Sequence, residues 1–505
     1  MTTTTGVRTA RPVPSIETVP PLGAGIVHLV AEYWPFARTG GLAEAVRGVA
    51  EHQARSGAPT FVFMPLYRSV RESGVALERF GESYSVKFGS RTEEARLWLA
   101  PGRPGAPKVL FVDHPHYFDR AGIYGEAGGD YPDNHRRFAF FAKAALQAIP
   151  TLGESRWVLH AHDWHTALAP VYLRTEFASR PEFDAIATVL SVHNAGYQGH
   201  FGPEILPDLG LPREMYHWAH MEWYGKVNWL KGGLVYSDFA ATVSPTHAYE
   251  LRTPQGGFGL HDQFIALGDR LVGILNGIDL GIWDPETDPS IPARFTKEDL
   301  TGKAVCKADL QRAAGLPVEP RKLLVGMTAR LAQQKGFDIL LGDGLLYRVD
   351  AQFIFVGEGE ARYREALAQV AHHMPDRVAV RFEFTEEREH RLLAGSDSLM
   401  MPSLYEPCGL TQMRAQRYGA LPVVRKVGGL SDTVEDQVTG FVFDEYSSAG
   451  LERALRRAIA TYEDERAWIN HMREAMSKDF GWERSAVRYL DLYRRALAAH
   501  APAKG

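Results

Sequence analysis

The sequence has little cysteine, little excess charge and no long hydrophobic run, and each shortage excludes a class of protein. Two cysteines, Cys306 and Cys408, among 505 residues do not suggest a disulfide framework, so we expect a reducing compartment, the cytoplasm. A formal net charge of -5, from 56 basic and 61 acidic residues, argues against bulk attraction to nucleic acid or a membrane. No apolar run is long enough to span a bilayer.

The composition is that of a globular chain, with 45% hydrophobic residues, enough for two or three domains that each have a core. No repeat is visible at solenoid periods. Residues 1–24 are rich in Thr, Pro and Arg and lack the continuous apolar segment of a signal peptide. We interpret them as a flexible tail, with a transit peptide as the alternative.

The first ordered segment has the pattern of a strand, a helix and a second strand. Gly25 to Ala31 is an unbroken apolar run, typical of a strand covered on both faces. A helix is predicted for residues 42–54 and a strand for residues 60–65. The loop before this helix carries Arg38, Gly40 and Gly41. Loop flexibility alone accounts for such a glycine pair, and the neighbouring arginine favours an anion site.

Polar side chains follow two later strands, predicted at residues 157–162 and 187–192. Asp163 and His193 therefore lie at the carboxyl edge of a parallel sheet, where ligands bind in open α/β folds. A second interpretation takes the histidines around Asp163 as metal ligands, because alternation places His160 and His162 on one face of their strand. A core histidine explains the same pattern, and no second ligand cluster is evident, so we do not favour a metal.

A second unit is predicted to begin near residue 270 and to repeat the alternation of strands and helices. Its expected strands are residues 323–327, 352–356, 378–382, 398–401, 421–424 and 441–443, and its last three helices are residues 449–462, 466–478 and 484–498. Before this boundary, in the first unit, we expect a helix at residues 223–234 and a strand at 240–245, and Asp133 is expected to cap an earlier helix. The predicted fold class is α/β, with two doubly wound units facing each other.

Two cations follow the first strand of the second unit. Arg330 and Lys335 lie past its carboxyl end, and Gly357 follows the next strand along the chain. An arginine fork and a lysine ammonium together suit a diphosphate. Surface salt bridges are the ordinary alternative for such a pair.

The segment Ser403 to Gln412 is predicted to turn from a strand into a helix that ends near Gly419. The N–H groups of Gly409, Leu410 and Thr411 would then point out of the helix start, where they favour a phosphate. Glu406 precedes them, and a carboxylate beside an anion site needs another partner, such as sugar hydroxyls. An ordinary strand-to-helix loop with a surface glutamate fits the same residues equally well.

Several motifs in the same order resemble those of bacterial glycogen synthases and plant starch synthases. The motifs are Arg38–Glu44, similar to Lys-Thr-Gly-Gly-Leu-Ala-Asp of the family; His160–Pro170; Val192–Asn194 with Tyr197–Gly199; Leu275–Asp279; Arg330–Leu331 with Gln334–Gly336; and Glu406–Gln412. The resemblance extends from about residue 25 to 495. It implies the GT-B fold, two Rossmann-like domains across a deep cleft.

The resemblance also implies an activity and a set of partners. The family transfers glucose, with retention of configuration, from a nucleotide diphosphate sugar to the non-reducing end of an α-1,4-glucan such as glycogen. We expect ADP-glucose as donor. UDP-glucose or a small-sugar acceptor is the alternative, and a non-catalytic glucan-binding protein is the third reading. No nucleic acid or membrane partner is implied, and the oligomeric state stays open.

By the same resemblance, individual residues receive roles. Arg330 and Lys335 hold the donor diphosphate, while Glu406, Asp163 and His193 contact glucose hydroxyls, and the His193 carbonyl lies near the anomeric carbon. The remaining residues assigned to the nucleotide sugar are Arg38, Gly40, Gly41, Asn276, Gly357, Cys408, Gly409, Leu410 and Thr411. Because the transition state is oxocarbenium-like and no side-chain nucleophile is needed, catalysis would rest on positioning and on stabilising the leaving group.

The resemblance does not imply a metal or another cofactor. The sequence has no Asp-x-Asp triplet, the usual metal-binding motif of the other major glycosyltransferase fold. Three positions depart from the family pattern: Arg38 replaces a usual Lys, Tyr405 a usual Phe, and Val427 a usual Thr. The first leaves the donor preference open, because a guanidinium and an ammonium contact phosphate differently. The implied domains are residues 25–270 and 271–477, with a C-terminal helix in 478–505 that packs on the first domain.

Overall fold

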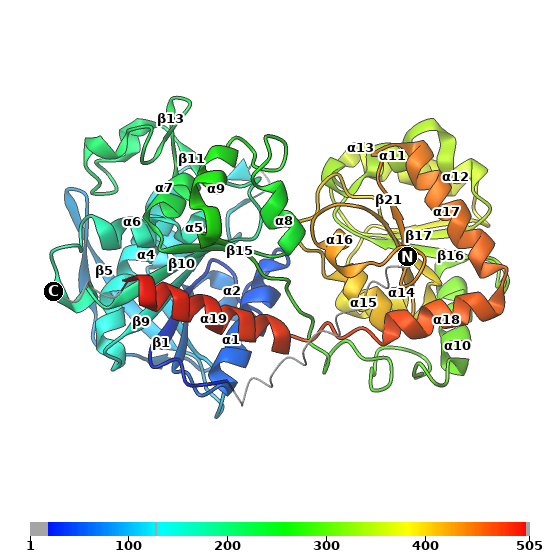
Figure 1. Ribbon diagram of the computed structural model, residues 1–505, viewed down its shortest axis with the longest axis horizontal. Coiled ribbons are helices and arrows are strands. Elements are labelled where there is room, and N and C mark those ends of the chain that lie inside the picture. The colour runs from blue at the N-terminus through cyan, green and yellow to red at the C-terminus, as the bar shows by residue number, and fades with distance from the viewer. Residues whose placement is uncertain (1–18, 127–128, 501–505) are drawn as a thin grey trace, which may run out of the picture. The chain divides into compact units, whose positions relative to one another are not determined.

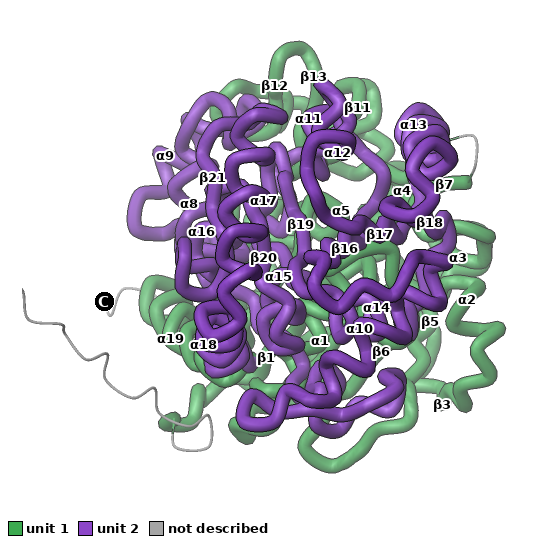
Figure 2. The backbone as a smooth tube through the Cα atoms, turned by 90° about the vertical axis from the view of Figure 1, so that its right-hand side faces the viewer, with its two compact units in different colours: residues 1–190, 198–239, 482–505 green, residues 191–197, 240–481 purple. Residues whose placement is uncertain are grey.

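The computed structural model describes residues 19–126 and 129–500. The backbone divides into two compact units (Figure 2), the first formed by residues 1–190, 198–239 and 482–505, the second by residues 191–197 and 240–481. This division counts residues 240–270 with the second unit, whereas the domain limits drawn from the sequence, near residue 270, remain a prediction. The expected tail of residues 1–24 lies mostly outside the described residues.

A largely parallel sheet forms the centre of the first unit. Its strand order is β10-β9-β1-β2-β6-β5-β3, and β4 pairs with β5. The strands are β1 (Gly25–Leu29), β2 (Thr60–Pro65), β3 (Glu78–Arg79), β4 (Tyr84–Phe88), β5 (Arg91–Leu99), β6 (Lys108–Asp113), β9 (Trp157–His162) and β10 (Ile186–Val192). Strands β1, β2, β9 and β10 are buried along their whole length, which explains why their sequences are mostly apolar.

Helices cover this sheet, and the last helix of the chain returns to it (Figure 1). They include α1 (Leu42–Arg55), α2 (Arg68–Glu72), α3 (Pro115–Phe118), α4 (Asn134–Ala148), α5 (Asp163–Thr166), α6 (Leu168–Arg174), α7 (Trp229–Tyr236) and α19 (Glu483–His500). A Cβ at Gly48 of α1 would lie 2.1 Å from the Trp482 ring beside the start of α19, so this glycine permits their close packing. Helix α19 thus belongs to the first unit.

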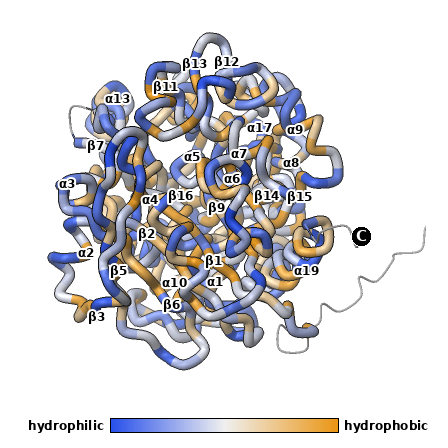
Figure 3. Tube along the Cα trace, turned by 90° about the vertical axis from the view of Figure 1, so that its left-hand side faces the viewer, coloured by the Kyte–Doolittle hydropathy of each residue, from blue (hydrophilic) through white to orange (hydrophobic). Residues whose placement is uncertain are grey.

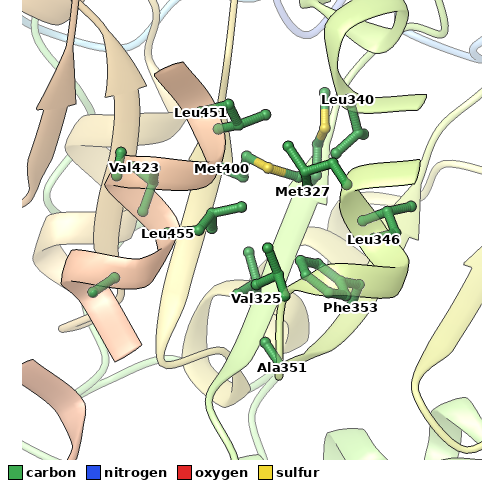
Figure 4. Packing of buried hydrophobic residues seen from close by; sticks show 14 of the residues in the cluster. Val325, Met327, Leu340, Leu346, Ala351, Phe353, Met400, Val423, Leu451 and Leu455 are labelled. Carbon is green, nitrogen blue, oxygen red and sulfur yellow. The ribbon is translucent and has the colours of Figure 1, made fainter. Parts of the chain in front are cut away.

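The second unit contains a parallel sheet of the doubly wound type. Its order is β18-β17-β16-β19-β20-β21, formed by β16 (Leu324–Thr328), β17 (Gln352–Val356), β18 (Val378–Arg381), β19 (Ser398–Met401), β20 (Leu421–Arg425) and β21 (Phe441–Phe443). Every one of these strands lies within two residues of its predicted position. A core of Val325, Met327, Phe353, Met400 and Leu451 joins the sheet to helix α17 (Ser448–Tyr462; Figure 4).

The other elements of this unit are helices and one further pair of strands. The helices are α8 (Pro245–Glu250), α9 (His261–Leu267), α10 (Thr301–Ala314), α11 (Phe337–Leu341), α12 (Leu345–Arg348), α13 (Ala361–His373), α14 (Glu386–Gly395), α15 (Thr411–Arg417), α16 (Gly428–Thr433), α17 (Ser448–Tyr462) and α18 (Glu465–Met476). A parallel pair, β14 (Phe239–Thr242) with β15 (Leu271–Gly273), precedes them. Two α/β units of largely parallel sheets and helices agree with the GT-B fold that the resemblance implies.

One expectation about local structure is wrong, and a second is confirmed in position only. The helix predicted at residues 223–234 begins at Trp229, because Glu222–Asn228 form the hairpin β12 (Glu222–Trp223) and β13 (Lys226–Asn228), which pairs with β11 (His200–Phe201). Asp133 does sit at the N-cap of α4, but its side chain accepts no capping hydrogen bond. It pairs instead with Arg120 at 2.6 Å, a stronger partner than a backbone amide.

Hydropathy follows the same architecture. Hydrophobic residues concentrate on inner strands such as β1 and β2 (Figure 3). Within residues 19–126 and 129–500, no helix combines the length and apolar character that crossing a bilayer requires.

Candidate functional site

The doubly wound sheet of the second unit has its switch point between β16 and β19. These two strands are parallel neighbours, and the chain winds outward from them in opposite directions. Ligands of such sheets bind beyond the carboxyl ends of the strands at the switch point. Arg330 and Lys335 follow β16, and Glu406 follows β19, so the topology brings these three predicted residues to the same edge.

Lys335 and Glu406 contact each other directly. Lys335 Nζ lies 2.6 Å from Glu406 Oε2, and Ser403 Oγ donates to the same carboxylate oxygen at 3.0 Å. Glu406 is 6% exposed, and a buried carboxylate needs a paired cation and hydrogen bonds to stay charged. The pairing removes the conflict between a carboxylate and an adjacent anion site, because the lysine balances its charge.

Backbone contacts hold these two loops together. Leu404 N donates to Gln334 O at 2.8 Å, and Gln334 Nε2 donates to Tyr405 O at 3.3 Å. Gly336 has a φ of +79°, and a Cβ there would lie 2.1 Å from Pro402 O. Glycine is therefore required at this position for the two loops to approach. The motif Gln334–Gly336 thus supplies both the cation of Lys335 and the close packing at Gly336.

A second glycine pair supports the Glu406 loop from the other side. Gly428 has a φ of +41°, and a Cβ there would lie 1.9 Å from Glu406 O. Gly429 N donates to Glu406 O at 3.1 Å, and Gly428 N donates to Glu250 Oε1 at 2.8 Å. Sequence reasoning named this segment as a departure from the family but missed its role as a support, and it missed Glu250 altogether.

The turn into α15 has the geometry that the sequence predicts. Gly409 has a φ of +70°, and Met413 N donates a hydrogen bond to Leu410 O at the start of the helix. The amides of Gly409, Leu410 and Thr411 therefore precede the first bonded turn. Gly419 ends the helix with a φ of +64°. Its amide donates to Gln416 O, and the amide of Ala420 donates to Ala415 O. These are the hydrogen bonds of a Schellman cap.

Cys408 and Asn276 meet beside this turn. Burial raises the pKa of the Cys408 thiol to about 12, and the backbone of Asn276 hydrogen-bonds to it. The thiol therefore stays protonated near neutral pH and acts through packing rather than as a nucleophile. Its backbone carbonyl also lies close to Gly429, where a Cβ would come within 2.1 Å.

The loop after β17 is joined to the loop after β16. Gly357 has a φ of +149°, and a Cβ there would lie 1.9 Å from Ala329 O. Leu331 N donates to Glu358 O at 2.7 Å. These contacts flank Arg330, whose side chain is exposed, so Gly357 shapes the loop that carries this cation.

In the first unit, β1 and β9 form the corresponding switch point, since β1 is paired in parallel with both β2 and β9. Asp163 begins the helix that follows β9 and is 8% exposed. Its φ of +56° is rare for a residue other than glycine. Left-handed backbone at a strand-to-helix junction stores strain and is concentrated at functional sites, which supports the assignment of Asp163.

The loop after β1 binds a carboxylate of the chain itself. Thr39 N and Thr39 Oγ1 donate to the Glu32 carboxylate at 2.5 and 2.6 Å, and Gly40 N donates at 3.3 Å. Tyr124 OH donates to Glu32 Oε1 at 2.5 Å. The amides of this loop thus do bind an anion, as the sequence suggests, but the anion in the structure is Glu32, which sequence reasoning missed.

The two predicted ligand positions in this loop differ in their surroundings. Arg38 pairs with Glu44 at 2.8 Å, and both side chains are partly exposed. A Cβ at Gly40 would meet no atom within 4 Å, and Gly40 has no left-handed φ. The fold itself therefore places no steric demand for glycine at this position. Gly41 is the N-cap of α1.

The histidines around Asp163 form a buried network. His28 Nδ1 lies 3.0 Å from His162 Nε2, and His28 Nε2 lies 2.7 Å from Gln53 Oε1. His160 Nδ1 contacts Tyr493 OH at 2.6 Å. The ligand atoms of His28, His160 and His162 lie within 4.8 Å of one another. His28 is the partner that the sequence did not reveal, and it is the polar residue in the otherwise apolar strand β1.

The hydrogen-bond partners in this network assign which ring nitrogens carry a proton. Because Gln53 Oε1 accepts from His28 Nε2, His28 Nδ1 accepts from His162. Gln53 Nε2 donates to Tyr493 OH at 3.0 Å, and that hydroxyl then donates to His160. Burial lowers the pKa of His28 to about 4, so the ring is neutral near pH 7. The network ties β1 and β9 to α1 and α19. His165 lies apart from it and stacks on Tyr124 at 4.6 Å.

His193 follows β10 and belongs to the segment counted with the second unit. Burial lowers the pKa of His193 to about 3, so the imidazole is uncharged near neutral pH. The Tyr405 hydroxyl hydrogen-bonds to the neighbouring Asn194, and its ring lies 5.1 Å from that of Phe258. The hydroxyl that distinguishes Tyr405 from the usual phenylalanine thus joins the His193 loop to the Glu406 loop.

Comparison with known proteins gives matches over most of the chain. Residues 25–266 match the family model described as starch synthase catalytic domain, and residues 311–475 match glycosyl transferases group 1. A glycogen synthase of Anaeromyxobacter dehalogenans strain 2CP-1 is 44% identical over 477 residues, covering 93% of this chain and 98% of the relative. A glycogen synthase of Syntrophotalea carbinolica is 42% identical over 483 residues, covering 94% and 99%.

Solved structures extend the comparison. The catalytic domain of starch synthase IV from Arabidopsis thaliana, bound to ADP and acarbose, has a TM-score of 0.86 and 33% identity, and the match covers 94% of this chain and 100% of that one. A sucrose-phosphate synthase from Thermosynechococcus elongatus has a TM-score of 0.58 at 17% identity. The second likeness concerns the fold alone.

Proposed function

The chain belongs to the glycogen synthase and starch synthase family, and from this premise we propose that it transfers glucose from ADP-glucose to the non-reducing end of an α-1,4-glucan, with retention of configuration. The observation that carries the proposal is the contact of Lys335 Nζ with Glu406 Oε2 at 2.6 Å, at the switch point of a doubly wound sheet. A cation for a diphosphate and a carboxylate for sugar hydroxyls lie side by side there.

Lys335 and Arg330 are assigned to the departing nucleoside diphosphate. An ammonium has three N–H donors, so the bond from Lys335 to Glu406 leaves it able to donate to phosphate oxygens as well. Arg330 adds a planar fork that suits a phosphate. Charge that develops on the leaving group is stabilised by these fixed cations, and each such group contributes about 3 kcal/mol, roughly a hundredfold in rate.

Glu406, Asp163 and His193 are assigned to the transferred glucose. Lys335 and Ser403 hold the Glu406 carboxylate, and Asp163 lies at a left-handed strand-to-helix junction. Fixed orientation is the main contribution of a site that lacks a covalent nucleophile. His193 is uncharged, so its ring or its carbonyl can face the sugar without adding charge. The leaving phosphate takes the proton of the acceptor hydroxyl.

ADP-glucose as donor is supported by the starch synthase relative that was solved with ADP and acarbose. Arg38 keeps UDP-glucose open as the alternative donor, because its guanidinium replaces a usual ammonium beside Gly40. We propose that no metal takes part, since cationic side chains at the β16 edge are available for the diphosphate. Both cysteines are free thiols, in keeping with the cytoplasmic location that we propose.

The test is incorporation of labelled glucose from ADP-glucose into glycogen, followed by digestion with an enzyme specific for α-1,4 linkages. We expect label in the glucan that this digestion releases. Label that appears as free glucose before the digestion would indicate hydrolysis of the donor without transfer and would contradict the proposal. Label that resists the digestion would indicate another linkage.

A further inference from the structure

The hairpin β12–β13 and the turn before it carry a group of exposed aromatic rings, the hairpin patch, defined here as residues 216–224. Trp218 is 71% exposed, Tyr224 82% and Tyr216 37%. Exposed large hydrophobic side chains that occur singly are ordinary, but these three fall within nine consecutive residues. The patch lies at the outer margin of the first unit, beside the label β13 in Figure 1.

Tyr224 occupies a strained position. Trp223 is paired with Lys226, so Tyr224 and Gly225 form a two-residue hairpin turn, and their φ values are +45° and +79°. A turn with both φ values positive prefers Asn, Asp or Gly at its first position. A tyrosine is strained there, and because its ring is largely exposed, packing gives little in return. Strain without a packing gain points to a binding role for the ring.

Buried polar contacts fix the backbone that presents these rings. Lys231, which is 5% exposed, donates to Trp218 O at 2.5 Å and to Glu222 O at 2.6 Å. Gly225 N donates to Glu222 Oε1 at 2.9 Å, and Glu222 N donates to His217 O at 3.2 Å. One buried cation therefore ties the Trp218 turn to the hairpin, so the rings are displayed on a rigid support, which lowers the entropy lost on binding.

The chemistry of the hairpin patch selects among ligands. Residues 216–226 contain one acidic side chain, Glu222, and one lysine, Lys226, so the patch lacks the cation cluster that nucleic acid or an anionic membrane surface requires. It also lacks the exposed aliphatic side chains of an obligate protein interface. The ring of His217 lies 5.4 Å from that of Trp218 and offers a hydrogen-bonding edge. Flat aromatic faces with polar neighbours suit a neutral ligand that has apolar C–H faces and hydroxyl edges, as a hexose ring has.

We infer that the hairpin patch binds α-1,4-glucan at the surface of the first unit and anchors the polymer that the enzyme extends. The choice of a glucan rests on the proposed function. Trp218 and Tyr224 stack on sugar rings, and the rigid hairpin sets their positions. A polymer acceptor gains affinity from such a second contact through its high effective concentration, whereas a short acceptor gains little.

The test is native electrophoresis of the full chain in gels with and without glycogen. Trp218→Ala and Tyr224→Asn are the test variants, and Tyr347→Ala, which removes a 52% exposed ring from the second unit, is the matched control. We expect both test variants to raise the apparent dissociation constant for glycogen about tenfold, the loss of one hot-spot aromatic residue, and the control to match the wild type. Equal retardation of all four proteins by glycogen would overturn the inference.

Thermal unfolding separates a binding role from a structural one. Because asparagine relaxes the turn, Tyr224→Asn should melt at or above the wild-type temperature while binding glycogen more weakly. A lower melting temperature would refute the strain argument. Sedimentation of the proteins without glycogen adds a further check, because a patch that joined two copies of the chain would make the wild type heavier than the variants, and this result would also overturn the inference.

Kinetics distinguish this inference from the proposed function. The ratio of KM for glycogen to KM for maltotriose should increase in both test variants. Glucosyl transfer by the wild type together with unchanged glycogen retardation would contradict the hairpin patch alone. Patch-dependent retardation without any glucosyl transfer would contradict the proposed function alone.

Discussion

Lys335 Nζ donates to Glu406 Oε2 across 2.6 Å, between loops that are 71 residues apart in the sequence. The contact forms where β16 and β19 meet as parallel neighbours. Neither residue is explained by the packing of the sheet, because both follow the strands rather than belong to them. The pair therefore belongs to the ligand-binding edge of the unit.

Lys335→Ala should lower kcat about a hundredfold and weaken ADP binding, because it removes a fixed cation from the departing diphosphate. It also leaves the buried Glu406 carboxylate without its cation, so a loss of stability is expected. Titration calorimetry with ADP is the measurement. Lys322→Ala is the control, since Lys322 forms a surface ion pair with the exposed Asp350 before β16 begins, and this variant removes one lysine without touching the site. Unchanged ADP affinity in Lys335→Ala would show that Lys335 does not bind the diphosphate.

Glu406→Gln should reduce turnover by roughly two orders of magnitude or more, while ADP affinity stays within a few-fold. The amide keeps the size of the side chain but loses the charge that orients sugar hydroxyls and pairs with Lys335. Steady-state kinetics and circular dichroism measure activity and fold. Glu452→Gln, on α17, alters a carboxylate with two arginine partners and serves as the control. Turnover near the wild-type rate would show that Glu406 does not orient the substrate.

Gly428→Ala should abolish activity and destabilise the second unit, because a Cβ would lie 1.9 Å from Glu406 O at a φ of +41°. Gly315→Ala isolates the backbone effect, since Gly315 has a φ of +80° and nothing within 4 Å of the added carbon. The control should cost about 1 kcal/mol and keep its activity. Equal losses in both variants would mean that the contact with the Glu406 loop is unimportant.

Stability should fall as the pH is lowered from about 6.5 to about 4, because burial lowers the pKa of His28 to about 4. The unfolded chain then binds protons that the folded chain excludes, so this contribution is complete above the unfolded pKa and is lost below it. For His28 alone the difference amounts to about 3 kcal/mol. Urea unfolding at several pH values measures the slope, and His28→Gln should flatten it. An equal slope in that variant would place the titration elsewhere, for instance at His165, whose pKa burial lowers to about 3.

Arg38→Lys should change the kinetics with ADP-glucose and UDP-glucose more than it changes stability. Arg38 is exposed and pairs with Glu44 at the surface, and such pairs contribute about 0–1 kcal/mol. Kinetics with both donors are the measurement. An identical donor profile in the two proteins would show that the substitution is neutral.

The sequence predicts those parts of the fold that are encoded locally. Buried parallel strands such as β1 and β16 are mostly apolar segments, so their positions follow directly from the sequence. The antiparallel strands β4 and β5 alternate exposed and buried residues and were not predicted. The prediction that a helix begins at residue 223 is wrong because a turn at Tyr224 and Gly225 precedes the helix. Helix-permissive composition cannot reveal such a turn.

For the candidate site, the motifs locate the loops but not their partners. Arg330, Lys335 and Glu406 follow from strand ends and charge. The support of Glu406 by Gly428 depends on a contact between the loop after β19 and the loop after β20, which the order of strands in the sheet brings together. The contact of Glu32 with Thr39 is local, seven residues apart in one loop, and depends on how that loop folds back on itself. No spacing rule specifies either contact. The buried hydrogen bond between His28 and His162 cannot be predicted from spacing either, because the two residues are 134 positions apart.

The most direct test of the account measures nucleotide release from ADP-glucose and from UDP-glucose, each with and without glycogen. The account predicts release of ADP that requires glycogen, with growth of the glucan, and much slower release of UDP. Absence of glycogen-dependent release from either donor would contradict it. Faster release of UDP than of ADP would retain the transferase but overturn the choice of donor.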